Sequence, residues 1–437
     1  MEGLKALEHR LHKLASMLGL PQQGPLPMLR ADHMGMLGMD CCLVKADNLS
    51  ALTWLQKQFS GSVDFCYIDP PYNTGNNFIY DDKRCASFDG VWGDHALWMS
   101  FMLPRLVAAR DLLSATGIIA VSIDDYEYVH LKIVMDAVFG GENYIATIVV
   151  NRSKNGKGSR AHVAISHEYV VVYGRSKSAK LTGLPERNAD GYDKEDVHGR
   201  YKVDGLFRKK GEASRREDRP AMFYPLYYDK QGNVFADPPN DKLGVAYPID
   251  SKGVERRWLW GIEKARRDSW QLYASPNGVI YVKNYLTEEK RIKVRSIWDD
   301  PRYLTERATN EIKEIYGEKV FETPKPVGLI EDLIDCAAGK NSLILDFFAG
   351  TGTTAHATFN LNKRDSGGRR VILVEESADI SEEHLAWKRG FRKTSDITEY
   401  RLKALRSADP GYCFSTVQEA PVRRSKQGTK GRFRDAA

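Results

Sequence analysis

Uninterrupted apolar runs alternate with amphipathic helical patterns in two separate parts of the chain. Runs such as 63–68, 118–123 and 342–348 are bounded by turn residues and predict buried strands. Between the strands, apolar positions recur with helical spacing, as in 98–113 and 128–139. Strands that alternate with helices are typical of a parallel, doubly wound sheet, so we expect an α/β fold.

The same patterns predict further elements and a domain order. Strands are expected at 42–45, 144–150, 169–173 and 371–374, and helices at 52–59, 327–338 and 397–405. The rhythm stops after the first sheet segment, where turns multiply and basic residues interleave with aromatic ones. We therefore divide the chain into an accessory arm (1–30), a first sheet part (31–150), an inserted β-rich region (151–320), a second sheet part (321–410) and a basic tail expected to be disordered (411–437).

The charge distribution singles out the inserted region. The chain has 437 residues and a net charge of +6, but 34 Lys and Arg face 25 Asp and Glu between Asn151 and Val320. A positive middle flanked by slightly acidic ends is typical of a protein that contacts a polyanion. We therefore expect this region to bind nucleic acid.

Cysteine usage and the absence of long apolar stretches limit the other classes of protein. The six cysteines form no Cys-x-x-Cys pair and have no His at zinc spacing, so we expect reduced thiols and no metal. No stretch reaches the apolar length of a membrane span, and the N-terminus lacks a signal-peptide pattern. The expected location is the cytoplasm, without a membrane partner.

The strand at 63–68 ends in an unusual polar turn, Asp69-Pro70-Pro71-Tyr72. Because two consecutive prolines cannot continue a sheet ladder, the backbone leaves the sheet at Asp69. A carboxylate, proline carbonyls and a Tyr ring are thereby placed at the carboxyl end of a strand, where open α/β sheets bind ligands. The simpler alternative is a turn that only ends the strand.

A glycine motif follows the strand at 342–348 and leads into a helix. Gly350-x-Gly352-x-x-Ala355, with Glu375 downstream, satisfies the dinucleotide fingerprint, in which glycines admit backbone to a phosphate and the acid binds ribose hydroxyls. The same geometry serves S-adenosylmethionine, which carries a methionine tail in place of the pyrophosphate. A nicotinamide-dependent oxidoreductase is therefore one alternative.

Several acidic positions have structural explanations. Asp47 ends the strand at 42–45 and can cap the next helix as well as face a ligand. Asp124 and Asp125 are expected to form a turn and cap a helix. We expect His167 and Glu168 to be a polar pair at a strand edge, without a catalytic role. The irregular segment 76–98 is a candidate lid over a bound base.

Together, the tetrad at Asp69 and the composite Asp346–Thr354 resemble the catalytic and cofactor motifs of amino-methyltransferases that act on DNA. The tetrad precedes the cofactor motif, which is the order of the β-group of that family. The detailed resemblance is closest to the modification subunits of type III restriction systems. It rests on the following segments: Asp47-Asn48, Asp69–Gly75, Ser122–Asp125, Ile165–Tyr169, Lys325-Pro326 and Asp346–Thr354. The chain is shorter than the usual type III subunit, so an orphan enzyme is also plausible.

The resemblance implies a fold, a cofactor and a set of site residues. The fold is a circularly permuted, Rossmann-like methyltransferase sheet with an inserted target-recognition domain, and the cofactor is S-adenosylmethionine. The implied catalytic residues are Asp69, Pro70, Pro71 and Tyr72. The implied cofactor-binding residues are Asp47, Lys325, Asp346, Phe347, Phe348, Ala349, Gly350, Gly352, Thr353, Thr354 and Glu375.

The resemblance also implies the reaction, which is methyl transfer to the N6 amine of an adenine flipped out of duplex DNA. In this family, Asp at the first tetrad position accompanies adenine, whereas Ser is commoner for cytosine. N4 methylation of cytosine, and a DNA-binding protein without catalysis, are the alternatives. The candidate DNA contacts are Arg208, Lys209, Lys210, Arg215, Arg216, Arg256 and Arg257. Besides double-stranded DNA, the candidate partners are a second copy of the chain and a restriction subunit.

Overall fold

The computed structural model describes residues 2–22, 24–27, 29, 38–73, 91–156, 162–187, 190–239, 242–287 and 290–418. The chain divides into two compact units. The first consists of Met1–Gly183 together with Lys293–Ala437, and the second consists of Leu184–Ile292. In sequence, the second unit is therefore an insertion within the first.

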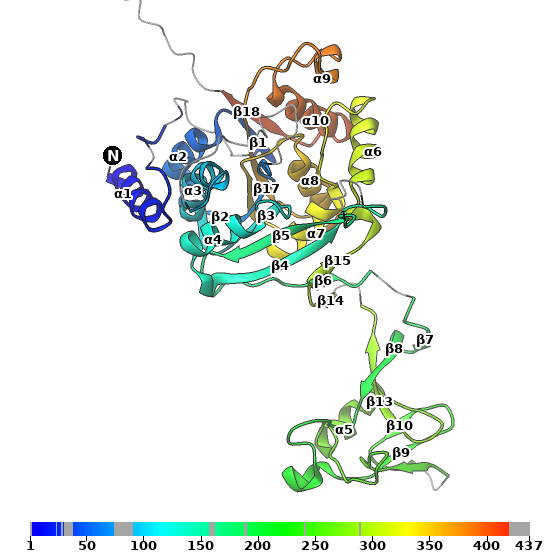
Figure 1. The fold of residues 1–437 in the computed structure, drawn as a ribbon. Coiled ribbons are helices and arrows are strands. Elements are labelled where there is room, and N and C mark those ends of the chain that lie inside the picture. Colours follow the sequence, from blue (N-terminus) through cyan, green and yellow to red (C-terminus); the bar gives the residue numbers. More distant parts are fainter. Residues whose placement is uncertain are drawn as a thin grey trace, which may run out of the picture. The chain divides into compact units, whose positions relative to one another are not determined.

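A mixed sheet, with nine strands in the described residues, forms the centre of the first unit (Figure 1). In hydrogen-bonding order the strands are β15 (Ile297–Trp298), β4 (Tyr144–Asn151), β5 (His167–Gly174), β3 (Leu113–Ile123), β2 (Val63–Ile68), β16 (Leu343–Asp346), β17 (Arg370–Glu375), β1 (Cys41–Lys45) and β18 (Phe414–Gln418). β5 runs antiparallel to its neighbours β3 and β4, whereas the other neighbours pair in parallel. The predicted α/β fold class is confirmed.

Strands from distant parts of the chain meet at the centre of this sheet. β2 lies directly beside β16, with Phe65 opposite Ile344 and Cys66 opposite Leu345. Beyond β16 the sheet continues with β17 and then with β1, so the first strand of the chain lies two positions from the strand of the glycine motif. This is the spatial order that a circularly permuted methyltransferase sheet requires, and that prediction is confirmed.

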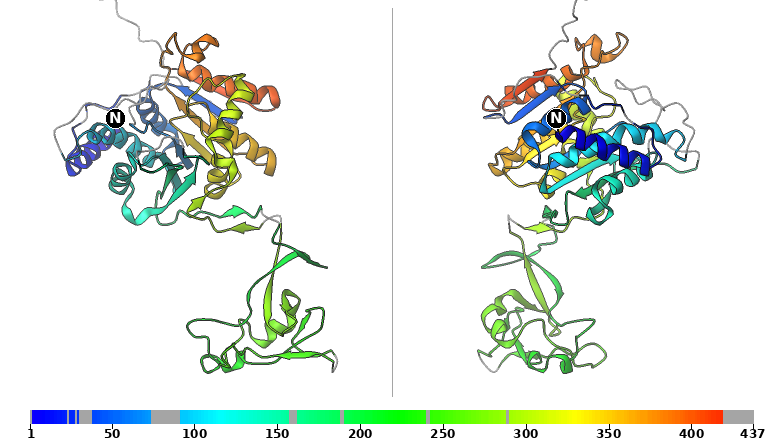
Figure 2. Two further views of the ribbon diagram at one scale, coloured as in Figure 1. Left: turned by 45° about the vertical axis from the view of Figure 1, so that its right-hand side comes forward. Right: turned by 90° about the vertical axis from the view of Figure 1, so that its left-hand side faces the viewer.

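Two groups of helices cover the faces of the sheet (Figure 1 and Figure 2). The first group consists of α1 (Glu2–Met17), α2 (Asn48–Phe59), α3 (His95–Leu112) and α4 (Tyr128–Phe139). The second group contains α6 (Thr305–Tyr316), α7 (Val327–Ala337), α8 (Thr353–Asp365), α9 (Leu385–Lys388) and α10 (Thr394–Ala408). None of the helices in the described part of the chain combines the length and apolarity that a membrane crossing requires.

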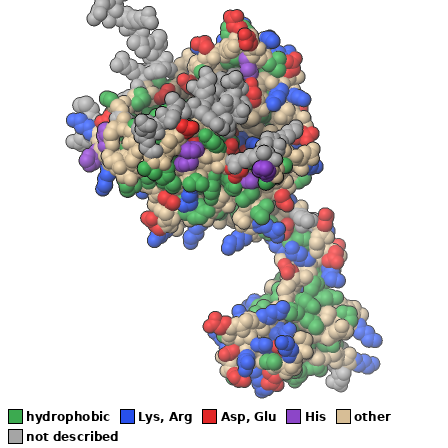
Figure 3. Space-filling model, viewed as in Figure 1, with side chains coloured by type: hydrophobic (Ala, Val, Ile, Leu, Met, Phe, Trp, Pro, Cys, Tyr) green, Lys and Arg blue, Asp and Glu red, His purple; other side chains and the backbone are tan. Residues whose placement is uncertain are grey.

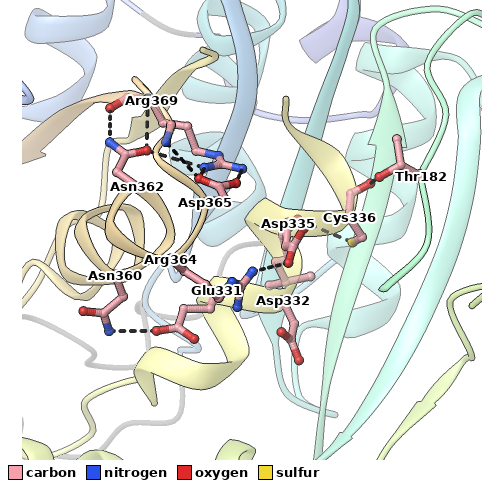
Figure 4. Close-up of polar contacts among 12 residues, drawn as sticks. Thr182, Glu331, Asp332, Asp335, Cys336, Asn360, Asn362, Arg364, Asp365 and Arg369 are labelled. Carbon is pink, nitrogen blue, oxygen red and sulfur yellow. Dashed lines mark hydrogen bonds and ion pairs between the residues drawn. The ribbon is translucent and has the colours of Figure 1, made fainter. Parts of the chain in front are cut away.

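Polar contacts hold together α7 and α8, the helices on either side of β16 in the sequence (Figure 4). Arg364 on α8 pairs with Asp335 on α7, and the Asn360 amide donates to Glu331 at 2.7 Å. At the end of α8, Arg369 pairs with Asp365 at 2.9 Å. These contacts fix the two helices that lead into and out of the glycine motif.

Three boundaries differ from the predicted ones. β18 lies within 411–437, the segment expected to be a disordered tail, because Phe414–Gln418 pairs in parallel with β1. The compact insert is narrower than 151–320, because β5, β15 and α6 belong to the first unit. β3 begins at Leu113, five residues before the predicted start, because Leu113 pairs with Val63 of β2 ahead of a shift in register.

The second unit is built from short strands around a small aromatic core. It contains β6 (Leu184–Pro185), β7 (Lys194–Asp196), β8 (Gly199–Leu206), β9 (Leu226–Tyr228), β10 (Val234–Phe235), β11 (Gly244–Ala246), α5 (Ile262–Asp268), β12 (Leu272–Ala274), β13 (Ile280–Tyr285) and β14 (Arg291–Ile292). Phe207 and Trp258 stack at its centre, with ring centroids 5.3 Å apart. Short 3-10 helices complete the described elements: η1 (Gly141–Asn143), η2 (Arg216–Asp218), η3 (Pro220–Met222), η4 (Ser269–Gln271) and η5 (Pro301–Tyr303).

Candidate active site

Four neighbouring parallel strands end at one edge of the main sheet, and each end carries a carboxylate. Asp69 follows β2, Asp346 ends β16, Glu375 ends β17 and Asp47 follows β1. The register fixes this arrangement, since Lys45 lies opposite Glu375 and Asp346 lies opposite Leu373. The carboxyl ends of the strands therefore form one acidic edge, which is the usual ligand site of an open α/β sheet.

A cavity of about 230 Å³ lies at this edge, entirely within the first unit. Polar groups line it from the strand ends, and aromatic rings of Phe101, Phe321 and Phe348 line it from the helices and loops. Most of the predicted site residues are in its wall: Asp47, Asp69, Pro71, Lys325, Asp346, Phe347, Phe348, Ala349, Gly350, Thr353, Thr354 and Glu375. An elongated ligand with an aromatic ring, hydroxyl groups and positive charge fits this lining.

The two carboxylates on the glycine side of the cavity are held by neutral donors. The Gly350 amide donates to Glu375 at 2.7 Å, and the Thr354 hydroxyl donates to Asp346 at 2.5 Å. Burial raises the pKa of Glu375 to about 8 and that of Asp346 to about 7. Both groups therefore favour a ligand that brings hydroxyl donors or positive charge to them.

The two glycines of the motif have different roles. Both adopt left-handed backbone conformations, with φ of 51° at Gly350 and 79° at Gly352. Gly350 lines the cavity. Gly352 caps α8 instead, and an added Cβ there would approach the Thr398 side chain at 3.2 Å. Gly352 is thus not among the residues that line the cavity and serves the turn and the packing of α10, and its role in cofactor binding stays a prediction.

Asp47 serves the fold and the cavity together. Its Oδ1 accepts the Ser50 amide at 2.8 Å, so Asp47 caps α2 as predicted. Its Oδ2 accepts Arg105 at 3.2 Å, and the Arg105 side chain also donates to Asn48 at 2.6 Å. The Asn48 amide in turn donates to the Phe347 carbonyl at 3.1 Å, which ties the end of β1 to the end of β16.

On the tetrad side, Asp69 lies in a compact polar network. The Tyr72 hydroxyl donates to Asp69 Oδ1 at 2.6 Å, and Lys325 Nζ lies 3.1 Å from the same oxygen. Lys325 also donates to the Tyr72 hydroxyl at 2.7 Å. Burial raises the pKa of Asp69 above its usual range, and the Lys325 ammonium opposes that rise. The site thus brings together three residues that the sequence assigned separately to catalysis and cofactor binding.

Glu168 completes this network, contrary to the expectation of a polar strand edge. Its side chain is almost fully buried, and Oε2 accepts Lys325 Nζ at 2.9 Å. Burial alone lowers the pKa of Lys325, but the Asp69 and Glu168 carboxylates outweigh it, so the ammonium is retained. Sequence reasoning missed Glu168 because its partner is far away in the sequence. The available signal was a charged residue within an otherwise apolar strand.

The remaining tetrad residues and neighbouring acids have structural contacts. The Pro71 carbonyl accepts the Trp98 indole N–H at 2.7 Å, and Pro70 is buried outside the cavity lining. Asp124 accepts the Tyr126 amide at 2.9 Å, which is the predicted turn. Most of the predicted lid at 76–98 falls within residues 74–90, outside the described residues.

The candidate DNA contacts in the second unit divide into two kinds. Arg216 pairs with Glu255 at 2.9 Å, Arg256 pairs with Asp250 at 2.9 Å, and Arg257 donates to the Ala213 carbonyl at 2.7 Å. These three arginines therefore hold loops of their own unit. Lys210 and Arg215 are exposed, and Arg208 and Lys209 are half-buried. Figure 3 shows Lys and Arg side chains among hydrophobic ones on one face of this unit.

Comparison with known proteins identifies the class. Residues 63–384 match the DNA methylase family N6_N4_Mtase. The chain is 50% identical over 411 residues to the type II methyltransferase M.KpnI of Klebsiella pneumoniae, covering 94% of this chain and 98% of that protein. It is 34% identical over 395 residues to the type III restriction-modification enzyme EcoPI Mod subunit of Escherichia phage P1, covering 83% of this chain and 61% of that subunit.

A solved structure of a putative DNA modification methylase from Thermus thermophilus, complexed with S-adenosyl-L-methionine, is similar at 13% identity with a TM-score of 0.40. That similarity covers 86% of this chain and 98% of the other.

The family match spans more than half of the sequence, so this chain belongs to the DNA methylase family. The predictions of a DNA methyltransferase and of relatedness to type III modification subunits are confirmed. The chain also resembles a type II methyltransferase over nearly the whole length of that relative. A nicotinamide-dependent oxidoreductase finds no support among these relatives.

Proposed function

We propose that this DNA methyltransferase methylates the N6 amine of adenine. The carrying observation is the Asp69 carboxylate in the cavity wall, with the Lys325 ammonium 3.1 Å away. The exocyclic amine is a poor nucleophile because its lone pair is delocalised into the ring. A fixed anionic acceptor for its hydrogens favours the tetrahedral nitrogen whose lone pair can attack a methyl group.

The residues that would hold S-adenosylmethionine are those of the glycine side. In the proposed arrangement, Glu375 accepts ribose hydroxyls, the backbone of 347–350 and Asp346 receive the methionine end, and the adenine lies towards Asp47. When bound, the cofactor supplies an electrophilic methyl group. The Lys325 ammonium lies between Asp69 and Glu168, so we propose that it serves the tetrad, where the base is methylated, and not the cofactor.

The remaining tetrad residues would position the base. A stacked adenine cannot reach a partly enclosed cavity, so the target must leave the duplex. Tyr72 is not among the residues that line the cavity, but its hydroxyl holds its ring next to Asp69, and we propose that this ring stacks on the flipped base. The Pro70 carbonyl is the proposed second acceptor for an amine hydrogen. The work of the site is then orientation and electrostatics.

Cytosine N4 is the second candidate acceptor, because the matched family bears both N6 and N4 in its name. The choice of adenine over cytosine rests on the family pattern, in which Asp at the first position of the tetrad accompanies adenine. Nucleosides from DNA methylated by the wild-type enzyme, separated by mass spectrometry, decide the matter. We expect N6-methyladenine, and N4-methylcytosine without methyladenine would overturn the proposal.

We further propose that the second unit recognises the DNA target. Its exposed cations can contact phosphates, while Arg216, Arg256 and Arg257 maintain its loops. Replacing Lys209, Lys210 and Arg215 by Ala should weaken binding and reduce the salt slope by about 0.9 for each phosphate that is no longer neutralised. The matched control replaces Arg266 and Arg267, exposed cations that already pair with Asp237 and Asp268. If the salt dependence of DNA binding has the same slope in both variants, Lys209, Lys210 and Arg215 do not contact DNA phosphates.

Two protein partners are also proposed. A restriction subunit is supported by relatives that are named Mod subunits of restriction-modification enzymes. A second copy of the chain is the other candidate. Light scattering of the purified protein, alone and with duplex DNA, distinguishes a monomer from a homodimer.

A further inference from the structure

A buried contact supports the tetrad from behind, outside the cavity. Asn73 directly follows Tyr72 and is only 2% exposed, and its backbone is left-handed, with φ of 57°. That conformation is unfavourable for most residues and is tolerated best by Gly and Asn. The Asn73 amide donates to Glu127 Oε1 at 2.7 Å, so a side-chain contact holds this residue in its turn.

Glu127 links three segments around that turn. The side chain is fully buried just before α4. Besides Asn73, Oε1 contacts Nδ1 of His95, the first residue of α3, at 2.9 Å. Oε2 lies 3.0 Å from Nδ1 of His130 in the first turn of α4. One carboxylate thus connects the tetrad turn to the starts of two packed helices.

A second contact supports the turn on the other side of Tyr72. The Trp98 indole on α3 donates to the Pro71 carbonyl at 2.7 Å. The residues before and after Tyr72 are therefore both fixed to groups carried by α3 or preceding α4. Since Tyr72 holds Asp69 through its hydroxyl, this support reaches the proposed acceptor.

Two histidines and a glutamate are also a common ligand set for a metal ion, but their geometry here is different. The His95 and His130 rings stack face to face, with centroids 3.8 Å apart and planes 14° from parallel. An imidazole nitrogen binds an ion close to the plane of its ring. One ion cannot lie near two nearly parallel, stacked ring planes at once. The cluster is therefore a support in which Glu127 Oε1 is hydrogen-bonded, while Oε2 only lies close to His130 without a hydrogen bond.

We propose that Glu127 is a positioning residue for methyl transfer, which fixes Asn73 and through it the orientation of Tyr72 and Asp69. This inference rests on the proposed function of the tetrad. Glu127 contacts neither the cavity nor the reacting groups, so its loss should reduce kcat and leave cofactor affinity unchanged.

The test exchanges donor and acceptor across the Glu127–Asn73 contact. Glu127→Gln removes the anionic acceptor, and we expect kcat to fall about tenfold to hundredfold. Asn73→Asp places a second carboxylate against Glu127, and the loss should be at least as large. The double variant restores one donor and one acceptor with the original net charge, so it should recover most of the lost kcat. Glu142→Gln, an exposed position shortly after α4, is the matched control and should equal the wild type.

The outcomes separate the inference from the proposed function. A wild-type enzyme that makes no N6-methyladenine contradicts the function itself. Wild-type kcat in Glu127→Gln, or a double variant no better than the worse single one, overturns the positioning role alone. Thermal unfolding of all four variants tests whether the loss of kcat is only an effect of reduced stability. If the double variant recovers kcat but not Tm, the recovery comes from the restored orientation of the tetrad. Stoichiometric zinc that is lost in His95→Ala would also overturn the hydrogen-bonded support.

Discussion

Two sets of carboxylates line one cavity, and their charges are stabilised by different kinds of group. Asp346 and Glu375, at the glycine side, receive backbone and hydroxyl donors. Asp69, at the tetrad side, lies against the ammonium of Lys325. Burial raises the pKa of all three, but among the described groups only Asp69 has a cation that opposes the rise.

The difference matches what each side is proposed to receive. A sulfonium and an ammonium group arrive with S-adenosylmethionine, so carboxylates on that side can obtain their counter-charge from the ligand. The acceptor amine is neutral and brings no charge. A cation that favours the ionised form of Asp69 before the base enters must therefore come from the protein, and Lys325 is placed to supply it.

The largest effect should come from the charge of Asp69. Asp69→Asn keeps the size of the side chain but removes the anionic acceptor, and we expect kcat to fall by about 10²–10³ or more. Cofactor and DNA affinity should be unchanged, as measured by calorimetry and filter binding. Asp379→Asn, on the surface, is the matched control. A normal kcat in Asp69→Asn would show that the charge of Asp69, and with it the neighbouring Lys325 cation, does not contribute to catalysis.

Removal of the built-in cation should have the next largest effect. Lys325→Met leaves Asp69 and the buried Glu168 as neighbouring carboxylates without a cation between them, so the pKa of Asp69 should rise further. We expect kcat at pH 7 to fall about tenfold to hundredfold, with the acidic limb of the pH profile moved to higher pH and partial recovery near pH 9. Lys325→Arg should retain the wild-type limb. A pH profile that keeps its shape in Lys325→Met would contradict this assignment.

Cofactor affinity should respond more modestly on the other side. Because the pKa of Glu375 is about 8, the affinity of the wild type for S-adenosylmethionine should rise as pH increases from 6 to 9. Glu375→Gln should bind about tenfold more weakly at pH 9, as expected for the loss of one charged hydrogen bond, and should lose this pH dependence. Titration calorimetry of the ligand-free enzyme measures both, and a parallel pH dependence in the variant would place the ribose elsewhere.

The smallest effect concerns stability without ligand. Native Glu375 holds a proton that the unfolded chain releases above pH 4.5, so raising the pH favours the unfolded state until about pH 8. Between pH 5 and 8 the Tm of the wild type should therefore fall relative to that of Glu375→Gln by about 2–4 °C or more. Calorimetric scans at several pH values test this. If the Tm of the wild type instead rises relative to that of Glu375→Gln between pH 5 and 8, the carboxylate is ionised in the folded protein.

Local patterns predicted the elements that carry the chemistry. The helix at 128–139 was predicted correctly because its apolar spacing ends at Gly140. The strand before Asp69 was also predicted correctly, because the two prolines that follow cannot continue the hydrogen bonding of the sheet. The glycine motif likewise set the start of α8. In each case the determining residues are neighbours in the sequence.

Contacts between distant segments could not be predicted in this way. Lys325 and Glu168 meet across 157 positions, and Glu127 reaches Asn73 across 54. No short-range pattern encodes either pairing. The edge strand β18 was missed because its alternating, partly exposed residues resemble the polar tail that follows it. The limits of the insert were missed because β5 and β15 are strands of the main sheet with a turn-rich, basic stretch between them.

The adjacency of β2 and β16 also bears on how the enzyme is made in the cell. The ribosome releases residues 63–68 long before 343–346, and at about 5–20 residues per second the delay is tens of seconds. During that interval the edge of β2 that will pair with β16 has no strand beside it, and unpaired edges attract other chains. The whole insert is synthesised in the meantime. The acceptor half of the site therefore exists as nascent chain before the cofactor half, and the two can join only after residues 343–346 have been synthesised.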